Sequence, residues 1–369
     1  MSAAPPREVA VAPPEPPAVA GRRPLRTGPF SAVLRTRPLV VLLICALVLL
    51  LAAAANMGRG DYPIAITDVL ATLFGGGDAG QQLVVLELRL PRTLVGALVG
   101  GALAVSGAIL QSVARNPLAS PDIIGVQWGA SAAAVFVIVL GGGMAGVGGL
   151  FASLGIPLAA LAGGLVSSTL VYVLAWRRGI QGYRLVLIGI GVQAVLVAAV
   201  QWLLTVAQIY QAAQAQVWLT GSLNARSWDQ VIPLSIAMAV LVPAALILAH
   251  LLGGLRFDDD TARGLGIRVD GARTALLIVS VGLASAATAA AGPIAFVALV
   301  VPQIARRICR VGSPPMAVSL VLGAALTVLA DLIARTVLPI ELPVGIVTAV
   351  LGAPYLLFLL ARARQEARS

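Results

Sequence analysis

The stretch "SGAILQSVARNPLASPDIIGVQWGAS", Ser106–Ser131, is a short polar hinge between two strongly apolar segments. Pro117 and Pro121 lie four residues apart in it, and proline is tolerated in the first turn of a helix but not in its interior. We therefore expect these prolines to end one helix and to begin the next. Asn116, beside the first proline, can satisfy backbone groups that the turn leaves unpaired. The stretch predicts two helices joined by a tight turn.

The composition predicts that these helices lie in a membrane. The chain of 369 residues is 59% hydrophobic and 11% charged, with a mean hydropathy of +0.97. In a soluble domain about a quarter of the residues are charged. A compact core could not enclose so many apolar side chains. The predicted fold class is therefore all-α, that of a polytopic membrane protein surrounded by the lipid bilayer.

The net charge is +10, which in a soluble protein would suggest a nucleic-acid partner. In this chain the basic residues lie in short segments between apolar spans, so they indicate orientation in the membrane instead. No nucleic-acid partner is expected.

Ten apolar segments are long enough to cross a bilayer, which takes about 20 residues of helix. They are 38–56, 92–112, 122–141, 150–176, 183–205, 230–250, 272–291, 293–310, 316–336 and 343–361. Residues 1–37 contain eight prolines and six arginines and are predicted to form a disordered cytoplasmic tail. Residues 38–364 are predicted to form the ten-helix transmembrane domain, and residues 365–369 a cytoplasmic C-terminal tail.

The arginines test this topology. With the N-terminus inside, 20 of the 25 arginines fall on the inner side of the ten spans, as the positive-inside rule requires. Both termini are therefore expected in the cytoplasm, and the protein in the plasma (inner) membrane. Ten helices divide into five and five, and two repeats with an odd number of spans must be inverted. An inverted five-helix repeat is a further hypothesis, although the residues themselves show no convincing repeat.

The chain has few groups with which it could perform chemistry. All 25 basic residues are Arg, so the Lys of a GxxxxGK[ST] phosphate-binding loop is missing and any ATP must be used by a partner. Cys45 and Cys309 have no CxxC spacing, and His250 has no cluster of ligands around it, so no metal site is predicted. We expect neither an enzyme nor a chain that binds its own cofactor.

Asp331 is the one carboxylate well inside a predicted span, and Arg335 follows four residues later on the same helix face. An ionisable residue inside a membrane is costly and often functional. The alternative is an ion pair that only neutralises itself near the outer end. A carrier driven by protons or sodium usually has several such carboxylates, so a single one favours a transporter with another driving force. A secondary transporter remains the alternative.

The longest charged inner loop is "LLGGLRFDDDTARGLGIRVDGAR", Leu251–Arg273. Acidic residues at the start of a short helix cap its free N–H groups and match its dipole. The three aspartates therefore predict a short helix, which Gly264 and Gly266 would end. Such a protruding helix suits the docking of a soluble partner, and an ordinary solvated connector is the alternative.

On the outer side, Arg89 and Arg92 precede the second span, and Pro91 between them fits a helix start. Outer arginines run against the positive-inside trend. Either they meet carboxylates of an external partner through charge-assisted hydrogen bonds, or they are simply solvated at the interface.

Five stretches together resemble a known family. They are the long segment "LRLPRTLVGALVGGALAVSGAILQSVARNPLASPDIIGVQWGA", "GYRLVLIGIGVQA" (Gly182–Ala194), "WLTGSLNARSW" (Trp218–Trp228), "GPIAFVALVVPQIARR" (Gly292–Arg307) and "ELPVGIVTAVLGAPYLLFLL" (Glu341–Leu360). In this order they resemble the FecCD-type permeases of iron–siderophore and cobalamin ABC importers, from about residue 38 to residue 364. One departure is Gln303 in "PQIARR", where many members have a His.

The resemblance implies a ten-helix permease of the type II ABC importer kind. Such a permease pairs with a second permease; a heterodimer is expected, with a homodimer as the alternative. Two ATP-binding subunits, which hold ATP and Mg, dock at the cytoplasmic face. An extracytoplasmic siderophore-binding protein delivers the cargo, expected to be ferric siderophore, with haem or cobalamin as the alternative.

The resemblance also implies roles for three groups of residues. The arginines that meet acidic lobes of the binding protein are Arg89, Arg92 and Arg335. The ATPase-coupling residues are Asp258, Asp259, Asp260, Ala262, Arg263, Leu265 and Gly266. The turn between the second and third spans, with candidate pathway residues, comprises Gln111, Asn116, Pro117 and Pro121.

Overall fold

The computed structural model has a helix at each of the ten segments predicted to span the membrane. It describes residues 24–27, 30–33, 36–60, 62–141, 150–176, 182–255, 257–337 and 340–366. The ten main helices are α1 (Thr36–Gly58), α4 (Leu90–Val113), α5 (Val126–Leu140), α6 (Leu150–Ala175), α7 (Gly182–Val206), α9 (Trp228–Gly254), α11 (Val269–Ala291), α12 (Val297–Cys309), α13 (Met316–Thr336) and α14 (Val344–Glu366).

Shorter elements connect or extend these helices. They are β1 (Pro24–Thr27), β2 (Phe30–Val33), α2 (Ile66–Leu73), α3 (Ala79–Gln82), the π-helical segment η1 (Leu83–Arg89), the 3-10 turn η2 (Pro121–Ile124), α8 (Ile209–Leu219) and α10 (Asp259–Gly264). Of these, the sequence predicted only α10. The others are short or mixed in polarity, so no span-length apolar pattern marks them.

The predicted all-α membrane architecture is confirmed. Seven helical segments of the described chain are long and apolar enough to cross a membrane, while α5 and α14 contain shorter apolar segments. Helix α12 has only 13 residues. The number of ten crossings therefore stays a prediction.

The predicted tails lie mostly outside the described residues. Strands β1 and β2 pair as an antiparallel hairpin, with Pro24 opposite Val33, and the disordered cytoplasmic tail stays a prediction. At the other end, α14 continues to Glu366, two residues into the predicted C-terminal tail.

The second span begins earlier than Pro91 predicted. The helical run is continuous from Ala79 to Val113, with η1 just before α4. A proline has no N–H for the helix ladder and clashes with the carbonyl one turn back. The wider π turn of η1 precedes Pro91 and is a known way to accommodate an irregularity inside a helix. The proline thus lies within the run instead of starting it.

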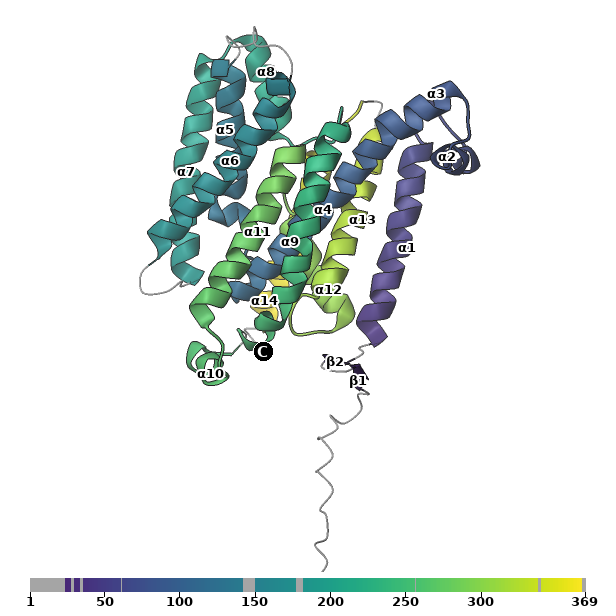
Figure 1. The fold of residues 1–369 in the computed structure, drawn as a ribbon. Coiled ribbons are helices and arrows are strands. Elements are labelled where there is room, and N and C mark those ends of the chain that lie inside the picture. Colours follow the sequence, from purple (N-terminus) through teal and green to yellow (C-terminus); the bar gives the residue numbers. More distant parts are fainter. Residues whose placement is uncertain are drawn as a thin grey trace, which may run out of the picture.

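Helix α4 is the centre of the bundle, and almost all of its residues from Val99 onward are buried. In Figure 1 it crosses behind α9 and beside α11 and α13. Its Gly107 is so close to α12 that a Cβ there would overlap the backbone carbonyl of Ala298. Small residues of this kind let helix backbones approach in lipid, where no hydrophobic force drives helices together.

A reciprocal contact joins α4 to α11. The Ser106 hydroxyl donates to the Ser280 carbonyl at 2.8 Å, and the Ser280 hydroxyl donates to the Ser106 carbonyl at 3.0 Å. These helices are the second and seventh of the ten, which an inverted five-helix repeat would make equivalent. A local two-fold axis would produce this exchange of identical bonds, and the repeat itself stays a hypothesis.

The polar connections divide between the two ends of the bundle. Figure 1 shows α10, the C-terminal end and the hairpin at one end, and α2, α3 and α8 at the other. The predicted coupling loop and the predicted outer arginines are thereby separated by the length of the helices.

Replacement of Gly107 by Ala tests the close approach of α4 to α12. We expect Gly107→Ala to lower the free energy of unfolding by about 1–3 kcal/mol, because the added methyl group must push the helices apart. Thermal unfolding of the detergent-purified chain measures the change. Gly253→Ala, in α9, is the control, since a Cβ there meets no atom within 4 Å. Equal effects of the two substitutions would show that α4 and α12 are not in tight contact.

Candidate functional site

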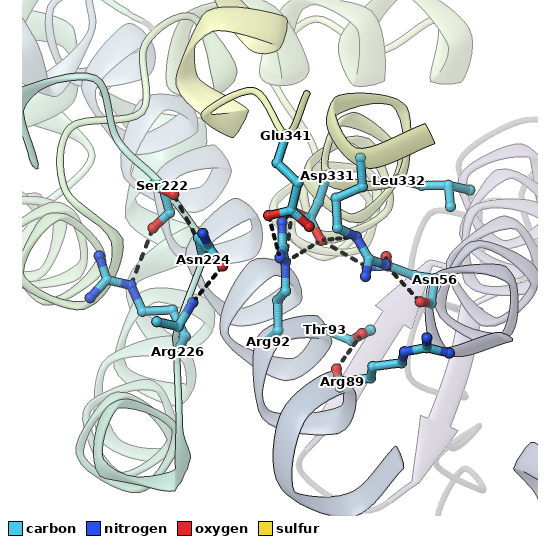
Figure 2. Close-up of polar contacts among 12 residues, drawn as sticks. Asn56, Arg89, Arg92, Thr93, Ser222, Asn224, Arg226, Asp331, Leu332 and Glu341 are labelled. Carbon is cyan, nitrogen blue, oxygen red and sulfur yellow. Dashed lines mark hydrogen bonds and ion pairs between the residues drawn. The ribbon is translucent and has the colours of Figure 1, made fainter. Parts of the chain in front are cut away.

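A buried ion pair lies at the N-terminal end of α4. Arg92 Nη2 is 2.8 Å from Asp331 Oδ1, and Arg92 Nε donates to Asp331 Oδ2 at 3.1 Å. The Asp331 side chain is 1% exposed. The same guanidinium lies 3.6 Å from the half-exposed carboxylate of Glu341. Figure 2 shows Arg92 pointing toward both acids. The pair joins α4 to α13, 239 residues away in the chain.

The pair that the sequence predicted on α13 is weaker. Arg335 Nε lies 3.8 Å from Asp331 Oδ2. Its Nη2 donates to the Asn56 carbonyl at 2.7 Å and to the Asn56 side chain. Asn56 in turn donates to Asp331 at 3.1 Å. Asp331 is therefore the centre of a network that joins α1, α4 and α13, and Arg92 is its main partner.

Arg89 closes the end of α1. Its Nη1 donates to the carbonyl of Met57 at 2.7 Å and its Nη2 to that of Tyr62 at 2.6 Å. Helix C-terminal carbonyls lack partners within the helix and carry partial negative charge. The guanidinium satisfies the end of α1, and the side chain is buried.

The three arginines predicted to lie on the outer side line one cavity of about 700 Å³, together with Arg226. Glu87 and Glu341 are its acidic lining residues, so arginines outnumber acids. Arg226 lies in the loop before α9 and donates to the Ser222 carbonyl at 3.2 Å (Figure 2). Within the described residues it has no carboxylate partner. Burial away from water lowers the pKa of Arg226. A carboxylate of a partner would stabilise the charged guanidinium and so offset the cost of this desolvation.

At the end of the bundle that carries α10, Arg115 ends α4 in an unusual way. The Asn116 N–H donates to the Gln111 carbonyl and the Arg115 N–H to that of Ser112, which is the Schellman pattern. The left-handed residue of this motif is usually glycine. Here it is Arg115, with φ of 49°, at a cost of about 1–2 kcal/mol.

The remaining turn follows the prediction closely. Asn116 Oδ1 accepts a hydrogen bond from the Leu118 N–H at 2.9 Å, and Pro121 is in the first turn of η2. Gln303 of α12 donates to the Gln111 side chain at 2.5 Å and to the Pro117 carbonyl at 3.2 Å. The turn is therefore fastened to α12.

The acidic loop forms the predicted short helix. Asp258 is the N-cap of α10 and accepts from the Thr261 N–H at 3.1 Å. Gly264 is the last helical residue, and Gly266 follows with φ of +81°. Ala262 packs inward with no exposed surface, whereas Leu265 is 62% exposed. Asp260 and Arg263 pair with each other at 3.1 Å on the exposed face.

Asp259 points toward the bundle instead. Its carboxylate lies 2.7 Å from Arg273 of α11 and 3.0 Å from Arg115 of the turn. The hydrogen bond from Arg273 holds the pKa of Asp259 below its ordinary value. These ion pairs are intact above the ordinary carboxyl range and are lost as the pH falls through the lowered pKa.

A second cavity, which the sequence did not predict, lies between α5, α7, α8, α12 and α14. It has a volume of about 570 Å³ and a mostly apolar lining that includes the polar side chains of Asp122, Gln127, Ser131, Gln193 and Thr220. Oδ1 of Asp122 is buried without a hydrogen-bond partner in the described structure. Phe296 lines the cavity with a left-handed φ of 68°, a strained conformation that is often found at functional sites.

The quoted sequence motifs converge on this cavity. Each of the five contributes lining residues. They are Asp122, Gln127 and Trp128 from the end of the first, Gln193 from the second, Leu219 and Thr220 from the third, Pro293, Ala295, Phe296 and Leu299 from the fourth, and Gly345, Ile346, Ala349 and Val350 from the fifth. Gln111, Asn116, Pro117 and Pro121 do not line it. Their role as pathway residues stays a prediction.

No group of three or more His, Cys, Asp or Glu that could hold a metal ion occurs among the residues that the structure describes. The arrangement offers surfaces for binding at both ends of the helix bundle and a cavity of about 570 Å³ between the helices.

Comparisons with known proteins agree with this geometry. The model of the FecCD transport family matches residues 44–362. The chain is 42% identical to the achromobactin transport system permease protein of Dickeya dadantii, over 92% of this chain and 96% of that protein. It is 41% identical to the ferric enterobactin transport system permease protein of Escherichia coli, over 90% and 98%.

A third relative and one solved structure extend the comparison. The chain is 38% identical to the iron(3+)-hydroxamate import system permease protein of Bacillus subtilis, over 89% of this chain and 98% of that protein. An inward-facing structure of a metal-chelate type ABC transporter superposes with a TM-score of 0.76 at 26% identity, covering 88% of this chain and 99% of that one.

Removal of the charge on Asp331 tests the outer network. We expect Asp331→Asn to destabilise the chain by about 3–5 kcal/mol, because it leaves buried arginines without their counter-charge. Glu341→Gln is the control. It removes a half-exposed partner of the same Arg92 and should cost about 1 kcal/mol or less. Thermal unfolding in detergent measures both, and a loss from Asp331→Asn no larger than that of the control would contradict a structural role for the network.

Proposed function

The chain belongs to the FecCD transport family, and from that premise we propose that it is the membrane permease subunit of an ATP-driven importer of ferric siderophore. The convergence of all five family-like motifs on one cavity carries the proposal. A chain of this family moves its cargo without covalent chemistry. ATP hydrolysis, with its Mg, is assigned to partner subunits.

The cargo is proposed from the relatives and from the cavity lining. Relatives are named for achromobactin, ferric enterobactin, iron(3+)-hydroxamate and ferric dicitrate transport. These ferric chelates are bulky and differ in shape. A mostly apolar cavity with few polar groups suits the passage of such molecules, since it offers no set of charges that would hold them tightly. Haem or cobalamin is the alternative cargo.

Two kinds of subunit complete the proposed transporter: a second permease in the membrane and ATP-binding subunits at the cytoplasmic side. A second permease, different from this chain, would close the cavity; a second copy of the chain is the alternative. Two ATP-binding subunits would dock at the cytoplasmic face, where α10 would provide the contact of this chain. The exposed apolar side chains that flank α10, Phe257 at 51% and Leu265 at 62% exposure, suit insertion into an apolar groove. The residues from Asp258 to Gly266 are proposed to form the contact.

The proposed orientation follows from charge. Arg115, Arg263, Arg273 and Arg306 lie at the end of the bundle that carries α10, and the rule that basic residues stay inside makes this the cytoplasmic end. The protein is therefore proposed to lie in the plasma (inner) membrane with both termini in the cytoplasm.

The outer cavity is the proposed docking site for an extracytoplasmic siderophore-binding protein. Arg89, Arg92 and Arg335 line it but donate hydrogen bonds within the chain. We assign the first contact with a partner carboxylate to Arg226, which has no acid partner in the described structure, and the positive surroundings to the other three. Charge complementarity of this kind governs mainly the rate and specificity of association.

Uptake of radiolabelled ferric siderophores by a strain lacking the chain tests the proposed function. We expect the wild-type gene to restore uptake, and we expect depletion of ATP to abolish it. Ala349→Trp should reduce uptake about tenfold or more, because the indole fills the cavity, while Leu351→Trp, on the outward face of the same helix, should not. Uptake that persists without ATP would indicate a secondary transporter, and equal uptake by both variants would remove the cavity from the pathway.

Charge reversal at Arg226 tests the docking site. Arg226→Glu should weaken binding of the siderophore-binding protein to reconstituted vesicles about tenfold or more, because two carboxylates would then face each other. Arg59→Glu makes the same change on the same face outside the cavity lining and is the control. Unchanged affinity of the Arg226 variant would overturn the assignment.

A further inference from the structure

Asp259 differs from its two neighbours in what it contacts. Asp258 caps α10 itself, through Thr261, and Asp260 pairs with Arg263 within α10, with its side chain 93% exposed. Asp259 alone of the three reaches outside the helix. It binds Arg273 in the second turn of α11 through two hydrogen bonds of 2.7 and 2.9 Å, and Arg115 at 3.0 Å.

Arg115 makes the second half of this contact. Besides Asp259, it donates to the carbonyls of Leu255 and Phe257, which lie on the segment between α9 and α10. One side chain therefore fastens both the start of α10 and the segment that leads to it. Arg115 does so from a left-handed position where glycine would be free of strain.

The other partner, Arg273, is nearly buried, with 9% of its side chain exposed. It is anchored in α11, which is joined to α4 by the Ser106–Ser280 bonds. Asp259 thus contacts the cytoplasmic ends of two helices that are themselves fastened to each other.

We infer that Asp259, held by Arg115 and Arg273, is a latch that makes α10 move as one body with the cytoplasmic ends of α4 and α11. The inference rests on the proposed function, in which α10 meets the ATP-binding subunits. A displacement of α10 then reaches the transmembrane helices through these ion pairs, and not only through the short connections of its own backbone. Asp259 is a positioning residue in this scheme, since it touches neither nucleotide nor cargo.

Hydrogen exchange of the purified full-length chain in detergent tests the latch without any partner. In Asp259→Asn we expect the amides of α10 to exchange about tenfold faster or more, because local opening no longer breaks two charge-assisted contacts. Asp260→Asn, one residue away in the same helix, should exchange as the wild type does. Equal exchange in all three proteins would overturn the latch.

Arg115→Gly distinguishes the role of Arg115 in holding Asp259 from its role in the turn after α4. Glycine removes the left-handed strain and keeps the end of α4, so the melting temperature should stay the same or rise, while exchange in α10 rises as in Asp259→Asn. A lower melting temperature with unchanged exchange in α10 would show that Arg115 only supports the turn.

Reconstitution of the chain with its second permease and ATP-binding subunits tests the consequence. We expect Asp259→Asn and Arg115→Gly to hydrolyse ATP but to move about tenfold less ferric siderophore for each ATP, with Asp259→Glu restoring part of the ratio. If both variants move as much ferric siderophore for each ATP as the wild type does, Asp259 and Arg115 do not transmit the movement of α10 to the transmembrane helices. A wild-type complex without ATP-driven uptake would instead overturn the proposed function, while the exchange measurement would still decide on the latch.

Discussion

The burial of α4 is the constraint on which the rest of the structure depends. A helix surrounded by other helices in lipid needs small side chains where its neighbours cross, and α4 supplies Gly100, Gly107 and Ser106 at such points. With 24 residues it is about 36 Å long. Its N-terminal end carries Arg92 and its C-terminal end Gln111, followed by Arg115. The arginine network around Asp331 and the proposed latch at Asp259 are thus attached to opposite ends of one tightly packed helix.

The buried charges complement this packing. Arg92 is neutralised by Asp331, and Arg89 is satisfied by carbonyls at the end of α1. An unpaired charge at either position would be very costly, whereas a paired one contributes little net stability but favours one arrangement of the helices. Small residues allow the helices to pack closely, and the ion pairs favour contacts between particular helices. Both features are needed because lipid does not drive helices together by the hydrophobic effect.

Span-length apolar segments predicted the ten main helices because length and composition are local properties. The cap of α10 was predicted for the same reason, since Asp258 and Gly266 act within one turn of their own positions. Contacts between distant elements were not accessible. The i, i+4 rule paired Asp331 with Arg335, but the nearest guanidinium comes from Arg92, 239 residues away. Likewise the motifs that line the cavity were visible in the sequence, yet only the packing of five helices shows that they share one space.

Gln303 connects the two parts of the molecule, because α12 lines the cavity while the turn after α4 carries the latch residue Arg115. Its single amide nitrogen donates to both Gln111 and the Pro117 carbonyl. A ring nitrogen of a histidine bears at most one N–H and could not make both bonds. A glutamine side chain also does not titrate, whereas histidine changes charge near neutral pH. In this chain the tie between the turn and the cavity helix therefore holds at any pH at which the fold itself survives.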